Sequence, residues 1–237
     1  MNVLVTGSSS GIGETIARTL VKSGHNVLLM ARRAERLTSL ADELNEAGPR
    51  RAQARPGDVG VWDDCLAAVD AGLRAFGSLD ALVNAAGDWV EEPFIEVEPK
   101  VIERFIRTDV TGATQISRAI LPELKSRHGH LIHINGLQGF IRQRPPVLYA
   151  AVESAVRGLC ESLRWEVASY GVHVGLITLG AVANTQPADK EISLLAPEGK
   201  REKLSRSEVA AAVMFMLSQP YGVNVDEIVL TPLNQSW

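Results

Sequence analysis

A run of glycines and small hydroxyl residues, TGSSSGIG at positions 6–13, lies between the first apolar segment of the chain and a segment of helical period. Glycines allow the backbone to turn tightly and to approach a pyrophosphate, and the N–H groups at the start of a helix attract the anion. This strand–turn–helix context predicts a phosphate-binding turn for a dinucleotide rather than a simple tight turn. The residues expected to contact the ligand here are Gly7, Ser9, Gly11, Ile12 and Gly13.

Two arginines, Arg32 and Arg33, follow the second apolar segment, where an NAD-binding domain carries an acidic residue for the ribose hydroxyls. Guanidinium groups match a 2′-phosphate through planar, charge-assisted hydrogen bonds. The alternative is that both arginines form a solvated surface at a helix start, where cations are mildly unfavourable. We therefore predict that the cofactor is NADP(H) rather than NAD(H).

Short apolar runs alternate with segments of helical period, a pattern typical of βαβ units around a parallel sheet. Strands are predicted at residues 2–6, 26–30, 51–55, 81–84, 130–134, 173–177 and 227–230. Helices are predicted at residues 13–23, 35–47, 61–76, 100–127, 150–168 and 207–217, the last with Ser207 at its start. The predicted fold class is α/β, a Rossmann-like doubly wound parallel sheet of about seven strands with helices on both faces.

The length of 237 residues suits a single domain, residues 1–237, because no composition shift or repeat marks a second one. The least regular stretch, residues 180–205, is expected to hold a variable substrate loop. A net charge of −4 gives no electrostatic reason to expect nucleic acid, and no apolar run is long enough to span a membrane.

Two cysteines, Cys65 and Cys160, occur without a CxxC motif or a histidine cluster at metal-ligand spacing. They predict neither a disulfide framework nor a metal site. Met1 leads directly into the first predicted strand without a targeting peptide, so we expect a cytoplasmic protein.

The spacing Gly-x3-Gly-x-Gly in the glycine run resembles the short-chain dehydrogenase/reductase family rather than other dinucleotide-binding folds. Three later segments resemble motifs of the same family: DV at 58–59, DALVNAAG at 80–87 and GAV at 180–182. The chain departs from the family pattern at Ala85, where Asn is commonest, and at Leu179, where Pro is usual. The resemblance covers essentially the whole chain and implies further cofactor contacts by Asp58, Val59, Asn84, Ala86, Gly87, Gly180 and Val182.

The catalytic groups that the resemblance implies are largely replaced in this chain. Members of the family use a Tyr-x3-Lys pair, a Ser thirteen residues before the Tyr, and an Asn on the preceding long helix. Tyr149 matches the tyrosine, which acts on the substrate oxygen and also contacts the cofactor, but the lysine position holds Glu153. The serine position holds Gly136 and the asparagine position holds Asp109. The expected catalytic residues are therefore Tyr149, Glu153 and Asp109.

Glu153 follows Tyr149 by four residues and lies on the same face of the predicted helix. A carboxylate there disfavours the tyrosinate and raises the pKa of Tyr149, so the usual proton route of the family is expected to be slowed. Two interpretations of the carboxylates stay open. Either Glu153 pairs with Arg157 at i+4 and Asp109 is a simple polar replacement, or Asp109 and Glu153 converge on the cleft as a new acid/base pair.

Other side chains near the predicted cleft offer further contacts. His133, Asn135 and Gln138 lie on or just after the fifth predicted strand. We expect His133 to be structural and Gln138 to be able to donate to a substrate oxygen. Trp89 either walls the substrate pocket or is an exposed loop residue without a ligand role.

The sequence leaves three functions open. The favoured interpretation is an atypical NADP(H)-dependent oxidoreductase that interconverts a carbonyl and an alcohol with an altered or impaired proton relay. The alternatives are a non-catalytic subunit that partners an active paralogue, and a non-redox enzyme, such as a cyclase, dehydratase or isomerase, that reuses the cleft. The identity of the small-molecule substrate is not readable from these residues.

Members of the family commonly bury two long helices, here residues 100–127 and 150–168, in a four-helix interface. The resemblance therefore implies a homodimer or homotetramer, or a hetero-oligomer with an active paralogue. Apolar positions on these helices fit such an interface and fit a core equally well. They are Val110, Ile116, Ile120, Val152, Val156, Leu159 and Leu163.

Overall fold

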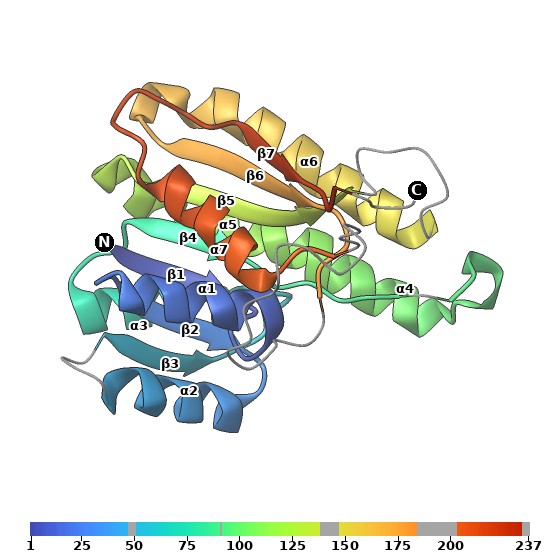
Figure 1. Cartoon of the computed structure of the whole chain (residues 1–237), viewed down its shortest axis with the longest axis horizontal. Helices are drawn as coiled ribbons and strands as arrows, with labels where there is room; N and C mark the ends of the chain where they lie inside the picture. Colours follow the sequence, from blue (N-terminus) through green and yellow to red (C-terminus); the bar gives the residue numbers. More distant parts are fainter. Residues whose placement is uncertain (47–50, 91, 138–146, 184–202, 234–237) are drawn as a thin grey trace.

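The chain forms a seven-stranded sheet in a computed structural model, which describes residues 1–46, 51–90, 92–137, 147–183 and 203–233. The strand order is β3-β2-β1-β4-β5-β6-β7, and all neighbouring strands run parallel (Figure 1). The strands are β1 (Asn2–Thr6), β2 (Asn26–Ala31), β3 (Ala52–Pro56), β4 (Ala81–Asn84), β5 (His130–Gly136), β6 (His173–Leu179) and β7 (Glu227–Leu230).

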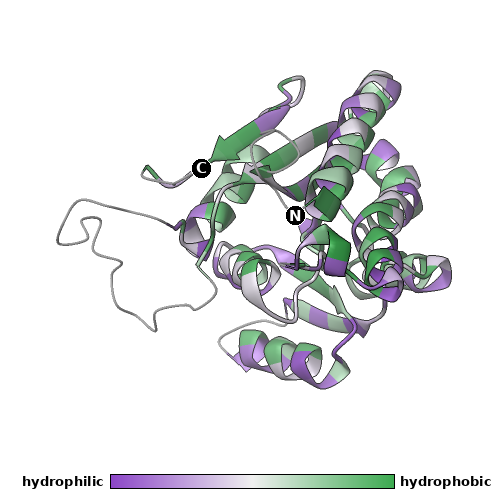
Figure 2. Ribbon diagram, turned by 90° about the vertical axis from the view of Figure 1, so that its right-hand side faces the viewer, coloured by the Kyte–Doolittle hydropathy of each residue, from purple (hydrophilic) through white to green (hydrophobic). Residues whose placement is uncertain are grey.

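Helices cover both faces of the sheet, as parallel strands require for their crossover connections. One face carries α1 (Gly11–Lys22), α2 (Ala34–Glu46) and α7 (Arg206–Leu217), and the other carries α3 (Trp62–Phe76), α5 (Gly112–Arg127) and α6 (Val147–Val167). The helix α4 (Pro99–Ile106) precedes α5, and short 3-10 turns lie at Phe94–Glu96 and Ala168–Tyr170. Figure 2 shows hydrophobic stretches in the inner strands and helices of mixed character, because β1, β2, β4, β5 and β6 are largely buried while each helix buries one face.

The predicted fold class is confirmed, and the predicted strands differ from the observed ones by two residues at most. The predicted start of the last helix is wrong, because Ser205 rather than Ser207 caps α7. The hydroxyl of Ser205 accepts from the backbone N–H of Glu208 at 3.3 Å, and the Glu208 carboxylate accepts from the Ser205 N–H at 2.8 Å. This reciprocal capping box needs the acidic residue three positions after the cap, which only Ser205 satisfies.

The predicted helix 100–127 is interrupted by a π-helical turn at Arg107–Thr111, between α4 and α5. Such single-turn widenings are rare and often occur at functional sites. Asp109 lies within this turn, and Pro122 lies inside α5 without ending it. The carboxylate predicted to take part in the site therefore projects from a locally widened segment rather than from a regular helix.

The apolar positions proposed for an oligomer interface pack within the chain itself. Ile116, Ile120 and Val156 are buried between the sheet and the helices α3, α5 and α6. Val152 is buried in a smaller cluster with Phe105. These residues are explained by the core, so they give no support for an interface, and the oligomeric state stays a prediction. Within the described residues, no helix has the length and apolar character needed to cross a membrane.

Candidate functional site

The winding of the sheet changes direction between β1 and β4, and a cavity of about 320 Å³ opens beside the carboxyl ends of these strands. Open α/β sheets bind ligands in crevices at such a switch point. Most residues predicted to contact the cofactor line this cavity: Gly7, Ser9, Ile12, Gly13, Arg32, Arg33, Asp58, Val59, Ala86 and Gly87. Gly11 belongs to the same run but does not line the cavity.

Two glycines of the run allow backbone segments to touch. Gly7 has a φ of 65°, and a Cβ added to it would lie 2.4 Å from the carbonyl oxygen of Ala85. A Cβ on Gly13 would lie 2.5 Å from the carbonyl oxygen of Gly7. The start of α1 has no side-chain cap at Ser10, which leaves its N–H groups available to an anion.

The Arg33 guanidinium is held at the rim of this cavity by two serine hydroxyls. Its Nη2 lies 2.9 Å from the Oγ of Ser9 and 2.5 Å from the Oγ of Ser10. Arg32 lines the same cavity beside it. The glycine run and the two arginines thus meet at one rim, which joins the predicted pyrophosphate site to the predicted 2′-phosphate site.

Asp58 and Val59 line the cavity from the loop after β3. The Oδ2 atom of Asp58 accepts from Nη2 of Arg107 at 2.9 Å, and its Oδ1 accepts from the Gly60 N–H at 2.8 Å. The Asp58 carboxylate therefore fixes the loop and links it to the π-helical turn that begins at Arg107.

A buried hydrogen-bond network supports the end of β4. The Thr6 hydroxyl accepts from the Ala86 N–H and donates to the Oδ1 of Asn84. The Nδ2 of Asn84 lies 3.0 Å from Nδ1 of His133, and the Nε2 of His133 lies 2.9 Å from the Ser117 hydroxyl. Because an amide nitrogen only donates, Nδ1 of His133 accepts and Nε2 carries the proton. Burial lowers the pKa of His133 to about 4, so this histidine is neutral and structural, as predicted.

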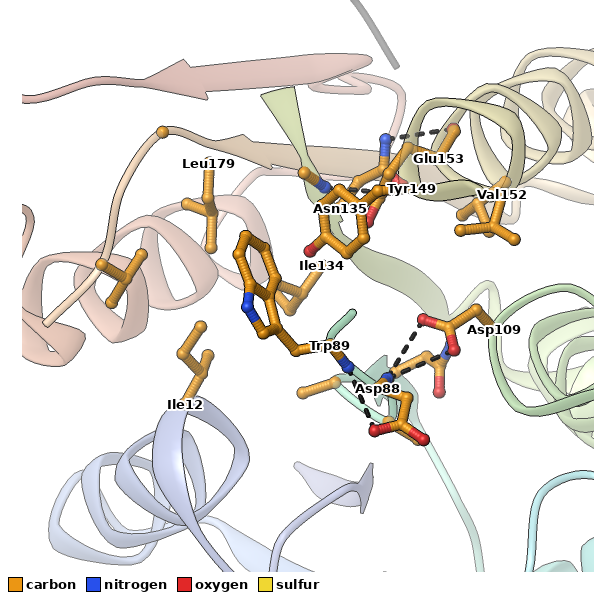
Figure 3. Close-up of a pocket in the computed structure, with 18 of the residues that line it drawn as sticks. Ile12, Asp88, Trp89, Asp109, Ile134, Asn135, Tyr149, Val152, Glu153 and Leu179 are labelled. Carbon is orange, nitrogen blue, oxygen red and sulfur yellow. Dashed lines mark hydrogen bonds between the residues drawn. The ribbon is translucent and has the colours of Figure 1, made fainter. Parts of the chain in front are cut away.

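A larger cavity of about 670 Å³ adjoins the first one, and both are lined by Ile12, Ala85, Ala86 and Gly87. The three predicted catalytic residues line it, together with predicted cofactor residues at the ends of β4 and β6 (Figure 3). These lining residues are Asn84, Asp109, Tyr149, Glu153, Gly180 and Val182. Residues 184–202 and Gln138, which we predicted to contribute a substrate loop and a donor, lie outside the described residues.

Aromatic rings surround the Tyr149 side chain. The Trp89 ring meets it edge to face with centroids 4.9 Å apart, and the Phe105 ring lies 5.8 Å away on the side of α4. Trp89 is 52% exposed and lines the cavity, so it forms an outer wall between Tyr149 and solvent (Figure 3). Of the two roles left open for Trp89, this placement agrees with the pocket wall.

The predicted alternative of a Glu153–Arg157 pair is wrong. The Oε2 atom of Glu153 accepts from the backbone N–H of Gly136 at 2.6 Å, across from α6 to the end of β5. Gly136 is the residue that we predicted at the family's serine position, and here its backbone N–H donates to the carboxylate. Arg157 instead makes a bidentate ion pair with Glu227 of β7 and a longer one with Glu161.

The Asp109 carboxylate accepts two hydrogen bonds from the backbone N–H of Asp88, at 3.3 and 3.2 Å. It packs against Gly87, since a Cβ added to Gly87 would lie 3.0 Å from its Oδ1. The π-helical turn and the end of the β4 loop therefore hold Asp109 at the edge of the cavity that contains Tyr149. Asp109 and Glu153 converge on one cleft, as the second interpretation predicts.

The protonation of these groups is set mainly by burial. Burial, helped by the charges of Glu153 and Asp88, raises the pKa of Asp109 to about 8, against the lowering effect of the Asp88 N–H and the Arg32 charge. Burial also raises the pKa of Glu153 to about 7, against the lowering effect of the Gly136 N–H and the Tyr149 hydroxyl. The pKa of Tyr149 is raised far above its ordinary value by burial first, then by the charges of Glu153 and Asp109.

Replacing Asp109 by asparagine is expected to stabilise the protein at alkaline pH by several kcal/mol, because it removes a buried carboxylate that resists ionisation. The native state holds a proton on Asp109 up to pH about 8, whereas the unfolded chain loses it near pH 4. The free energy of unfolding of the native sequence therefore falls as pH rises through this window, and that of D109N lacks this contribution. Urea unfolding of both proteins at about pH 5 and about pH 9 measures the difference. A stability difference that does not grow with pH would contradict it.

Two cavity residues complete the site. Lys203 was not predicted as a site residue, and no sequence signal distinguishes it from the irregular segment around it. Asn135 at the end of β5 was noted only as lying near the cleft, and it lines the cavity beside Tyr149 and Glu153 (Figure 3).

Residues 1–193 match the family described as short chain dehydrogenase. The chain is 32% identical over 234 residues to an uncharacterized oxidoreductase of Staphylococcus epidermidis, covering 97% of this chain and 96% of that protein. Serine dehydrogenase from Escherichia coli shares the fold with a TM-score of 0.86 and 28% identity, covering all of both chains. An alcohol dehydrogenase from the archaeon Thermococcus sibiricus, complexed with 5-hydroxy-NADP, has a TM-score of 0.85 and 26% identity, covering 99% of this chain and 97% of that one. With the glycine run, the switch-point cavity and the tyrosine in place, the chain belongs to the short chain dehydrogenase family.

Proposed function

We propose that the protein is an NADP(H)-dependent oxidoreductase that interconverts a carbonyl and an alcohol through a carboxylate-based proton relay. One observation carries this proposal: the cavity of the glycine run and the cavity of Tyr149 share a wall formed by Ile12, Ala85, Ala86 and Gly87. A dinucleotide whose phosphates lie on the glycine run would extend past this wall toward Tyr149.

The residues of the smaller cavity fit a phosphorylated dinucleotide. Gly7 and Gly13 occupy positions where a Cβ would meet backbone, and the uncapped start of α1 faces the same region. Arg33 supports NADP(H) over NAD(H), because it offers a charged donor where an acidic residue would accept ribose hydroxyls. The Thermococcus sibiricus alcohol dehydrogenase, similar to this chain, was crystallised with an NADP derivative.

When bound, the nicotinamide supplies or accepts the hydride. Tyr149 stays protonated at neutral pH, since its pKa is raised, and its hydroxyl donates to the substrate oxygen during reduction. Glu153, with a pKa of about 7, holds the proton that replaces the one given by Tyr149. In the oxidation direction the Glu153 carboxylate accepts the proton instead. This role substitutes for the lysine that the family places at the same position.

A direct test follows cofactor oxidation or reduction by the purified protein, with NADPH and a panel of aldehydes and ketones, and with NADP⁺ and alcohols. We expect turnover with at least one substrate class and loss of turnover in Y149F, which removes the hydroxyl but keeps the ring contacts. Binding of NADPH is measured separately by calorimetry. Bound NADPH without hydride transfer across the panel would refute the proposal.

Replacing Arg33 by methionine is expected to weaken NADPH binding by about tenfold to hundredfold, because charge-assisted hydrogen bonds to the 2′-phosphate are lost. Binding of NADH should be unchanged, since it lacks that phosphate. The dissociation constants of both cofactors provide the measurement. R36M is the matched control, because Arg36 is exposed on α2 and does not line the cavity. Equal losses for NADPH and NADH in R33M would contradict the assignment.

A second candidate function rests on the two buried carboxylates, whose raised pKa values suit acid/base chemistry without a hydride. A cyclase, dehydratase or isomerase would use Asp109 and Glu153 in this way. Product formation that persists without NADP(H) but is lost in E153Q would favour this function over the first.

A further inference from the structure

The loop after β4 carries two groups that contact the predicted catalytic residues. The backbone N–H of Asp88 donates to both carboxylate oxygens of Asp109, at 3.3 and 3.2 Å. The next residue, Trp89, places its ring edge to face against Tyr149, with centroids 4.9 Å apart (Figure 3). The position of two consecutive residues therefore decides both what the Asp109 carboxylate accepts and what covers the tyrosine ring.

The Asp88 side chain holds this loop from two directions. Its Oδ1 accepts from the Trp89 N–H at 3.1 Å, and its Oδ2 accepts from the Nε of Arg104 at 2.8 Å. Arg104 lies on α4, next to Phe105, whose ring centroid lies 5.8 Å from that of Tyr149. The ion pair thus joins the loop to a helix that already packs against the tyrosine.

The Asp88–Arg104 pair is too exposed to contribute much to the stability of the fold. The Arg104 side chain is 51% exposed and that of Asp88 is 26% exposed. Water screens such pairs, and most contribute little to the free energy of folding. An effect of this pair on the loop can therefore be separated from an effect on stability, because only the first should be sizeable.

We propose that Asp88 and Arg104 are positioning residues of the candidate site: their ion pair fixes the loop after β4, so that the Asp88 N–H stays on Asp109 and the Trp89 ring stays against Tyr149. Arg104 lines neither of the two cavities, so it acts through Asp88. This inference rests on the proposed function for the roles of Asp109 and Tyr149, but it concerns their geometry and is tested without substrate.

The pKa of Asp109 reports the contact with the Asp88 N–H. That N–H lowers the pKa of Asp109, whereas the charge of the Asp88 carboxylate raises it. Glu153 raises the same pKa and Arg32 lowers it, and both residues are kept in every variant of the test. Changes at Asp88 and Arg104 therefore predict shifts of defined sign.

R104Q loosens the N–H contact and leaves the Asp88 charge uncompensated, so both effects should raise the pKa of Asp109, by about half a pH unit. D88N removes the charge but keeps an oxygen that can accept from the Trp89 N–H, so it should lower the pKa of Asp109. The measurement is an NMR titration of the carboxyl carbons in protein with isotope-labelled aspartate. D109N assigns the signal.

Acrylamide quenching of Trp89 fluorescence reports the contact with Tyr149. The Trp89 signal is the difference between each protein and the same protein with W89F added. In R104Q the quenching should rise, because the freed ring turns from Tyr149 toward solvent. R104K keeps a cation that can replace the single Nε contact to Asp88, so it should return both the quenching and the pKa of Asp109 to near their native values.

K100Q is the matched control, because Lys100 is a cation of the same helix that pairs with Glu98 rather than with the loop. It should change neither readout. The urea midpoint of R104Q should fall by no more than about 0.5 M. A larger fall, the absence of either change in R104Q, or equal changes in K100Q would overturn the inference.

The proposed function fails by a separate criterion. A protein that shows both changes in R104Q but transfers no hydride keeps the positioning role of Asp88 and Arg104 and loses the proposed redox function. A protein that reduces a ketone with NADPH, but whose Asp109 and Trp89 signals do not respond to R104Q, keeps that function and loses this inference.

Discussion

Replacing Glu153 by glutamine is expected to lower kcat of the carbonyl reduction by about 10²- to 10⁴-fold, the usual contribution of a positioned general acid or base. Glutamine keeps an oxygen that can accept from the Gly136 N–H, so the link between α6 and β5 survives the change. What is lost is the proton that Glu153 exchanges with Tyr149. Steady-state kinetics with NADPH and a carbonyl substrate identified by the panel give the measurement.

The pH profile separates this loss of a proton from a structural defect. Reduction needs the acid form of Glu153, so kcat of the native protein should fall as pH rises through about 7, the pKa of this group. Oxidation needs the carboxylate, so its rate should fall as pH drops through the same value. Both dependences should disappear in E153Q.

E166Q serves as the control for Glu153, because Glu166 is an exposed carboxylate farther along α6 and away from the cavity. Its kcat and pH profile should match those of the native protein. An unchanged kcat in E153Q, with the pH dependence intact, would show that another group holds the proton.

Replacing Gly7 by alanine is expected to lower the free energy of unfolding by about 3 kcal/mol. Two costs add here, because alanine is strained in the left-handed backbone conformation and its Cβ overlaps a neighbouring backbone atom. The added Cβ would meet the Ala85 carbonyl oxygen at 2.4 Å, so the glycine run must move away from the end of β4. That movement displaces Ala86 and Gly87 from the wall shared by the two cavities, and NADPH binding should weaken as well. Urea unfolding and an NADPH titration provide the two measurements.

Gly11 offers a matched control for Gly7. It has a similar φ of 62°, but a Cβ added there meets no atom within 4 Å. G11A therefore introduces left-handed backbone strain without a steric overlap. It should lower the free energy of unfolding by about 1 kcal/mol. Equal destabilisation of G7A and G11A would show that the contact with Ala85 is not what requires glycine at position 7.

The fold was predictable because its signals are local. The glycine run, the alternation of apolar and helical segments and the arginines after β2 each depend on a few neighbouring residues. The cap of α7 was missed although its signal is also local, since Ser205 and Glu208 have the spacing of a capping box. The π-helical turn at Arg107–Thr111 has no comparable signal, because the same residues fit a regular helix equally well.

The candidate site was predictable only in part. The convergence of Asp109 and Glu153 on the cleft was one of two interpretations that the sequence left open, and both residues line the larger cavity. The hydrogen-bond partner of Glu153 could not be predicted in this way. Arg157 forms an ion pair with Glu227 instead, which lies seventy residues later in the chain, on β7. The Oδ1 of Asn135, which has no hydrogen-bond partner among the described residues, is likewise a result of packing between β5 and α6. Neither the Arg157–Glu227 pair nor the environment of the Asn135 oxygen can be predicted from residues close in sequence.

The hydrogen bond between Gly136 and Glu153 also bears on how this site can be re-engineered. Glu153→Lys alone would restore the lysine of the family but leave the Gly136 N–H without its acceptor and bring an ammonium against a donor. Gly136→Ser alone would add a hydroxyl where the Glu153 carboxylate already approaches the backbone. The two positions are therefore coupled: each single substitution should impair the protein, and only the double substitution installs the serine and lysine together.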